Sequence, residues 1–448
     1  MKYYKSRIKY TILSFLILLT GSTILKAQEF YSLPKILEIG LENNYDIRIV
    51  RNEQKMAENN TTIGNAGFLP TLDLSAGYSG SINDIDQKNV DGTNSRTDGI
   101  HNHGANLGLN MNWTIFNGLS IVTNYERLKE FRRMGELNTQ LSVEDLLAGL
   151  TAEYYNYVRQ NIRLSNLRYA VTLSKERLRI VEAHYIIGSK SGLELQQARV
   201  DFNADSSKLL TQFEAVYASA ITLNRLMALD DVSQKLIVSD TTINPNPFLN
   251  KEELWGLTLQ NNTELLLSDR NKTISELDYK SIRSRDFPYL KVNAGYGYTI
   301  NHYGSPTATI DRQNTLGFNY GVTLGFTLFD GFNRKREKQN ARLTIQNKEF
   351  QHEQLELSLK ADLANIWMAY QNNLELLGLE NENLEVAHDN YSIAMERYRL
   401  GDLPGIDLRE AQNSLLEAEE RLLQASYNTK LCEISLLQLS GQLPFYLQ

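Results

Sequence analysis

Four segments of the chain alternate between apolar residues and small or polar ones, and this pattern limits the possible folds more than any other feature. The segments cover about residues 69–82, 105–117, 289–301 and 315–329. In the last of them, Leu, Phe, Tyr and Val alternate with Gly, Asn and Thr. Successive side chains of a strand point to opposite faces. Each segment therefore predicts a strand with one apolar and one polar face.

Strands of this kind suit either a soluble antiparallel sheet with one buried face or a membrane barrel around a watery lumen. No further strands are predicted that would cover two apolar hairpins, so the barrel is favoured. Four strands cannot close a barrel alone, and lipid does not tolerate an open sheet edge. Two copies would give about eight strands and an interior filled by side chains, whereas three would give about twelve and leave an opening. A homotrimer is predicted.

The two halves of the chain resemble each other in sequence. Pro70 and Tyr78 recur as Pro288 and Tyr296 at one constant spacing, and IFNG before residue 119 recurs as LFDG before residue 332. An internal repeat of this kind predicts that one structural unit occurs twice. We expect a first repeat over 28–240, a linker over 241–250 that contains two prolines, a second repeat over 251–441 and a tail over 442–448.

Two segments, 119–186 and 332–399, have helical apolar spacing and contain no proline. At 1.5 Å per residue each would be about 100 Å long. Helices of that length need neighbours along their whole course, as in coiled coils. Shorter helices are expected over 33–65, 192–229, 251–284 and 405–439. The turns between a long helix and the returning helix are expected at about 187–193 and 400–406.

The remaining sequence features limit the classes of function. Residues 1–27 have the basic start and short apolar run of a secretory signal peptide. The net charge of −7 argues against a nucleic-acid partner, and a single cysteine, Cys432, excludes a disulfide framework within the chain. No nucleotide, nucleophile or metal-site motif is present. His101 and His103 fall in an expected polar loop, 83–103, and are interpreted as solvated. We expect neither catalysis nor a cofactor nor a metal.

The repeat, the hairpins and the two tips, HYIIGSKSGLELQQAR (184–199) and RYRLGDLPGIDLREAQ (397–412), resemble the outer-membrane factor family of TolC-like efflux and secretion channels. The resemblance implies an α+β membrane protein, a trimeric twelve-stranded β-barrel continued by a long α-helical barrel. It implies location in the outer membrane with an extension into the periplasm. It also implies a periplasmic adaptor and an inner-membrane pump or secretion ATPase as partners, with substrates conducted passively to the exterior. The alternative is a surface-exposed structural or adhesive coiled-coil trimer anchored by a barrel.

The resemblance also carries the candidate site. Asp407 and Glu410 lie three residues apart on one helical face, so three copies would form carboxylate rings that select cations at a periplasmic constriction. Glu194 holds the corresponding place in the first half. The alternative is that these are ordinary charges at the start of solvated helices. Where some family members carry an arginine that holds the tip closed, this chain has Leu403. The expected adaptor-docking residues are Gly188, Ser189, Gly192, Leu193, Gly401, Asp402, Leu403 and Gly405.

Overall fold

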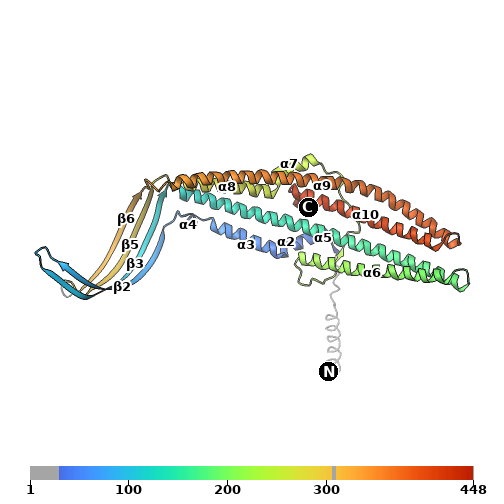
Figure 1. Ribbon diagram of the computed structural model, residues 1–448, viewed down its shortest axis with the longest axis horizontal. Helices are drawn as coiled ribbons and strands as arrows, with labels where there is room; N and C mark the ends of the chain where they lie inside the picture. The colour runs from blue at the N-terminus through green and yellow to red at the C-terminus, as the bar shows by residue number, and fades with distance from the viewer. Residues whose placement is uncertain (1–29, 305–308, 447–448) are drawn as a thin grey trace, which may run out of the picture. The chain divides into compact units, whose positions relative to one another are not determined.

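The computed structural model describes residues 30–304 and 309–446, in two units (Figure 1). Unit 1 contains the described residues up to Arg48, Ser142–Asn261 and the residues from Lys360 onward; unit 2 contains Ile49–Leu141 and Asn262–Leu359. The expected signal peptide lies outside the described residues. None of the described helices combines the length and hydropathy needed to cross a bilayer.

Unit 2 is built around an antiparallel sheet whose strands follow the order β2-β3-β5-β6. The strands overlap the four alternating segments of the sequence. Because β2 and β6 each have a single neighbour among the described residues, both edges of the sheet are open. The bounds are β2 (Thr71–Lys88), β3 (Asn94–Asn117), β5 (Tyr289–Tyr303) and β6 (Arg312–Gly325).

The strand register keeps the two faces of the sheet chemically distinct. One row across the four strands consists of Leu74, Leu109, Tyr296 and Phe318, and the next row, on the opposite face, of Ser75, Gly108, Gly297 and Gly317. The apolar face is exposed in the single chain, since Leu74 keeps 74% and Phe318 64% of its accessible surface. An apolar surface of this extent indicates a lipid or protein environment.

The first hairpin is longer than the sequence predicts. Residues 83–103, expected as a polar loop, instead continue β2 to Lys88 and begin β3 at Asn94, with a short turn in which Asp91 accepts a 2.9 Å bond from the Thr93 backbone N–H. Backbone pairing between polar segments forms this extension, with one added bond of 2.7 Å from the Gly99 N–H to Asp84 Oδ1, so the extension has no apolar alternation in the sequence. His101 and His103 are therefore strand residues.

Strand β6 ends earlier than expected, at Gly325 instead of about 329. The Arg334 guanidinium donates a 2.8 Å bond to the Thr327 carbonyl and another to the Arg285 carbonyl. The Thr327 carbonyl therefore accepts a hydrogen bond from an arginine side chain. If the strand continued, this carbonyl would instead pair with the backbone of the neighbouring strand.

The helices of unit 2 are most of α3 (Tyr45–Asn60), α4 (Ile63–Ala66), α8 (Thr263–Ser284) and the first parts of the long helices α5 (Ser120–Ile186) and α9 (Asn333–Leu400). Gly118, at the turn from β3 into α5, has a φ of +68°, and a Cβ there would lie 1.9 Å from the Ser284 carbonyl oxygen. Gly331 before α9 has nearly the same φ, +69°. Both turns therefore need glycine.

Two predicted helices are each interrupted by an asparagine. The segment 33–65 forms α2 (Leu33–Asn43), α3 (Tyr45–Asn60) and most of α4, and 251–284 forms α7 (Lys251–Asn261) and α8. Asn44 Oδ1 accepts the Asp46 backbone N–H at 2.9 Å, and Asn262 caps α8 through the Leu265 N–H at 3.1 Å. An asparagine that caps a following helix ends one helix and begins the next without a proline or glycine signal.

Unit 1 contains α2, α7, the second parts of α5 and α9, and the returning helices α6 (Gly192–Leu226) and α10 (Gly405–Leu439). Its main hydrophobic core includes Leu150, Tyr154, Val158 and Leu223. A two-stranded parallel sheet, β1 (Phe30–Tyr31) with β4 (Ile237–Val238), and a last short helix, α11 (Leu443–Tyr446), complete the unit.

The expected linker 241–250 is irregular in structure but is firmly held within unit 1. Its Asn246 backbone N–H donates a 2.8 Å bond to Glu433, and Lys430 bonds both Glu433 at 2.9 Å and the Asn244 carbonyl at 3.3 Å. The Lys430 and Glu433 side chains are 2% and 0% exposed. A buried ion pair therefore fixes this segment against α10.

Candidate functional site at the helical tips

Unit 1 ends in two helix-turn-helix tips with the same backbone geometry. Gly188 follows α5 with φ +76°, and Gly401 follows α9 with φ +84°. In the first tip the Ser189 N–H bonds the His184 carbonyl at 2.9 Å; in the second, the Asp402 N–H bonds the Arg397 carbonyl at 2.9 Å. This is the left-handed glycine ending that satisfies the last carbonyls of a helix. Gly188 and Gly401 fall within the segments expected as turns, about 187–193 and 400–406.

The tips present apolar side chains to solvent. Leu193, one of the predicted docking residues, is 80% exposed, and Ile406 in the second tip is 76% exposed. Leu403 differs, because it is half-buried against the hydrophobic cluster that includes Tyr398 and Leu408. Surface glycines and exposed aliphatic side chains together form a surface on which another protein can pack.

Glu194 has a local structural role at the first tip. It forms a capping box with Ser191, whose backbone N–H donates a 2.9 Å bond to the carboxylate, and it pairs with Lys190 at 2.9 Å. The bond from the Ser191 backbone, followed by the Lys190 contact, lowers the pKa of Glu194. The carboxylate is thus engaged in starting α6.

Asp407 and Glu410 are placed differently from Glu194. Both are exposed at the start of α10, whose N-cap residue, Pro404, supplies no side-chain bond. Within 30–304 and 309–446, neither carboxylate receives a hydrogen bond or an ion pair. The structure leaves these two charges available for a cation or a second chain.

The opposite face of α10 carries a buried ion pair that is not among the site residues expected from the sequence. Arg409 binds both carboxylate oxygens of Asp205 on α6, at 2.6 and 2.8 Å, and Ser174 on α5 also donates to this carboxylate. Burial acts to raise the pKa of Asp205, but the bonds from Arg409 and Ser174 outweigh it and hold that pKa below its usual value. One carboxylate, 1% exposed, therefore joins three helices just above the tips.

A second buried pair lies beside the first. Arg177 on α5 donates to Asp201 on α6, and both residues are buried. The sequence signal was present, because Asp201 and Asp205 continue the apolar stripe of Leu195 and Ala198 at helical spacing. Charges on a stripe that faces a core need oppositely charged partners.

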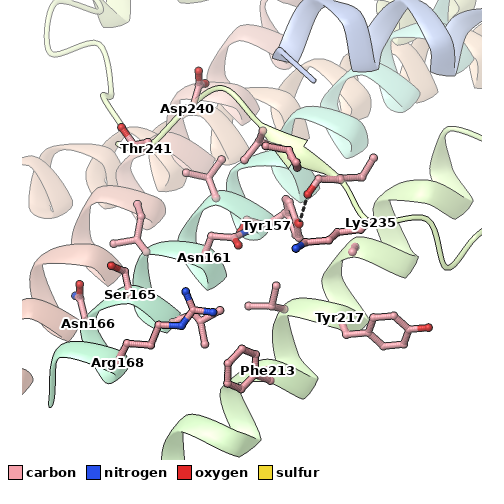
Figure 2. Close-up of a pocket in the computed structure, with 18 of the residues that line it drawn as sticks. Tyr157, Asn161, Ser165, Asn166, Arg168, Phe213, Tyr217, Lys235, Asp240 and Thr241 are labelled. Atoms are coloured by element: carbon pink, nitrogen blue, oxygen red, sulfur yellow. Dashed lines mark hydrogen bonds between the residues drawn. The ribbon is translucent and has the colours of Figure 1, made fainter. Parts of the chain in front are cut away.

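Among the hollows in the described part of unit 1, two bear on the candidate site. One, of about 790 Å³, lies between α5, α6 and the segment 233–241, where the Tyr157 hydroxyl donates a 2.8 Å bond to the Leu236 carbonyl (Figure 2). It contains none of the predicted site residues. The other, of about 440 Å³, lies at the tips and is lined by Glu194, Tyr398, Gly405 and Arg409 among others. Among the described residues, no three His, Cys, Asp or Glu side chains are grouped so as to hold a metal ion.

The sequence on both sides of the linker shows to which protein family the chain belongs. Residues 36–229 and 254–442 match the model of the outer membrane efflux protein family. The chain belongs to this family. It is accordingly an efflux protein of the cell outer membrane, and it extends into the periplasm.

Solved channels share the fold of this efflux protein at low sequence identity. The CmeC outer membrane channel of Campylobacter jejuni is 18% identical with a TM-score of 0.76, covering 92% of this chain and 85% of that one. VceC of Vibrio cholerae is 15% identical with a TM-score of 0.72 over 91% and 96% of the two chains. The MtrE channel of Neisseria gonorrhoeae is 15% identical with a TM-score of 0.71 over 92% and 89%. The α+β architecture is therefore that of outer-membrane efflux channels.

Proposed function

We propose that three copies of this efflux protein close one twelve-stranded β-barrel, continued by an α-helical barrel, and that the pore conducts substrates passively to the exterior. In this proposal the protein is the outer-membrane part of a tripartite efflux pump or a type I secretion system. A periplasmic adaptor binds the tips, and an inner-membrane pump or secretion ATPase supplies the energy.

The sheet of unit 2 is the observation that supports this proposal most strongly. Its apolar face is exposed, its other face consists largely of Gly, Asn, Ser and Thr, and β2 and β6 are open edges. Pairing β2 of one copy with β6 of the next satisfies both edges and places the small polar residues in the lumen. Three copies form the smallest such closed ring that leaves an opening.

The tips support the proposed gate and docking surface. In a threefold assembly the unpaired carboxylates of Asp407 and Glu410 would form stacked acidic rings, to which divalent cations bind. The exposed Leu193 and Ile406 would lie beside them as apolar contacts for the adaptor. Glu194 contributes to this site through the shape of the first tip, because its charge is already paired with Lys190.

We also infer that the chain arose by duplication, with repeats over 28–240 and 251–441 and a linker between them. The element order helix-helix-strand-strand-long helix-helix occurs in each half. The paired glycines Gly118 with Gly331 and Gly188 with Gly401 adopt matching positive φ values. Glycines with the same positive φ at corresponding positions of the two halves support a common origin of the halves.

The gate is tested by conductance across a planar lipid bilayer. We expect the purified protein to form ion-conducting channels that divalent cations block from the periplasmic side. The double variant Asp407→Ala, Glu410→Ala is expected to raise the blocking concentration at least about tenfold, or about 1.4 kcal/mol in binding. The matched control is Glu417→Ala, an exposed carboxylate two turns further along α10.

The two parts of the proposal fail separately in this experiment. Unchanged cation block in the double variant contradicts the carboxylate gate but leaves the channel intact. Absence of any conductance from correctly inserted protein contradicts the channel itself. Equal loss of block in Glu417→Ala would show that general surface charge, not the paired rings, attracts the cation.

A further inference from the structure

Three of the six histidines of the chain lie at one end of the sheet of unit 2. His103 on β3 and His302 on β5 are direct partners in the strand register. Their side chains therefore share a face, and their ring centroids are 4.9 Å apart with an angle of 56° between the ring planes. His101 is the next residue on the same face of β3, one step further along the strand.

We propose that His103 and His302 form a binding site for a borderline divalent cation, with Cu²⁺ as the tightest ligand. Neutral imidazole is the commonest metal ligand in proteins. At metal–nitrogen distances of about 2.0–2.1 Å, two imidazoles on one ion at square-planar or tetrahedral angles have ring centres roughly 4.5–5 Å apart. The observed separation falls in this range without any change in the backbone.

The pair lies on the same face as Leu74 and Phe318 but three rows of that face nearer the β2–β3 turn, between Gly80 and Arg312, and this end of the sheet leaves room for an ion and its waters. On the β2 side, His103 is opposite Gly80, where the nearest atoms to an added Cβ would be the Asn102 carbonyl oxygen at 3.7 Å and His103 Cβ at 3.9 Å. Gly80 itself has no side chain to cover the His103 ring, and the Tyr78 ring of β2 lies further along the strand, 6.4 Å from the His103 ring between centroids. On the β6 side, the residue opposite His302 is Arg312, whose Nε donates a 3.1 Å bond along its own strand to Asn314 Oδ1.

The pair is a two-ligand site, with water completing the coordination. In the described residues no three candidate ligands come together, and His101 is diagonal to His302, a separation of about 7–8 Å between such positions. An ion held by His103 and His302 would join β3 to β5 and so connect the two hairpins. Binding of the ion should therefore raise the stability of the sheet against unfolding.

The test is a titration of the purified, detergent-solubilised full chain with Cu²⁺ alone, by calorimetry and by electron paramagnetic resonance. We expect one Cu²⁺ per chain with a two-nitrogen signature. His103→Ala and His302→Ala should each weaken binding by on the order of tenfold or more, because a single imidazole loses the effective concentration of its neighbour. Without metal, both variants should keep the thermal stability of the unaltered protein.

His101→Ala is the matched control, since it removes a histidine from the same strand and the same face. We expect it to keep the affinity and the two-nitrogen signal. Unchanged Cu²⁺ binding in His103→Ala or His302→Ala would overturn the proposal. Equal loss in His101→Ala would also overturn it, because the ion would then be held by a different set of histidines.

Discussion

Arg409→Leu is expected to destabilise the helical unit by about 3–5 kcal/mol, the usual cost of leaving a buried charge without its partner. Arg409 donates two charged bonds to the Asp205 carboxylate, at 2.6 and 2.8 Å, beside the bond from Ser174, and Asp205 is 1% exposed. Without the guanidinium the carboxylate stays buried between α5 and α6. Chemical denaturation of the detergent-solubilised protein, followed by circular dichroism at neutral pH, measures the change.

Arg421→Leu is the matched control for this variant. Arg421 lies on the same helix and binds Glu380 at 3.0 Å, but its side chain is 50% exposed. Glu380 is 12% exposed, but water still reaches the guanidinium of this pair, so removing Arg421 should cost less than removing Arg409, on the order of 1 kcal/mol. Combining Arg409→Leu with Asp205→Leu should recover much of the loss, because an apolar pair replaces a buried ionic one. If Arg409→Leu costs no more than Arg421→Leu, the buried pair does not hold the tips together.

The same ion pair predicts a pH dependence. Burial acts to raise the pKa of Asp205, but the bonds from Arg409 and Ser174 outweigh it and lower that pKa below the unfolded value of about 3.9. The stabilisation is therefore fully present above the unfolded pKa and is lost as the pH falls through the folded one. In Arg409→Leu this acid-dependent part of the stability should disappear.

Phe318→Arg is expected to cost about 2–4 kcal/mol of barrel stability, as cationic side chains do near the middle of a lipid-facing barrel surface. Phe318 lies in the central apolar row with Leu74, Leu109 and Tyr296 and is 64% exposed. The proposed barrel places this row against the lipid chains, where a guanidinium is poorly solvated. Denaturant titration of protein folded into phospholipid vesicles measures the cost.

The neighbouring residue supplies the control for this substitution. Asn319→Arg places the same side chain on the opposite, polar face of β6. We expect a much smaller loss of stability and a shift of ion selectivity toward anions, because the new charge lies in the lumen. Equal costs at positions 318 and 319 would mean that the two faces meet the same environment, and the barrel orientation would be wrong.

Sequence reasoning predicted the elements whose signals are local and periodic. The apolar alternation around Phe318 and the glycines of the two tips can each be recognised in a single sequence. A further local signal, which was not among the expectations, is the spacing of Ser191 and Glu194, which is that of a capping box. The interruption of a helix at Asn44 gives a weaker sequence signal. A single asparagine can cap a helix or lie within one, and the sequence alone does not distinguish the two.

Other features depend on which segments meet in space. The extension of the first hairpin follows from backbone pairing between polar segments. The pairing of Arg409 with Asp205 joins residues about 200 positions apart, at 2.6 Å. His302 becomes the partner of His103 only once the register of β3 with β5 is known. The apolar stripe places Asp205 on the buried face of its helix but does not identify its partner, because each of these contacts is fixed by tertiary packing.

The most direct test of the account is the number of chains in the membrane-extracted particle. Light scattering coupled to size exclusion, corrected for bound detergent, measures it. We predict three chains, because three copies pair every β2 edge with a β6 edge and leave a lumen. A particle of one chain would leave both edges open in lipid, and a particle of two would fill its own interior. Either result would contradict the proposed channel.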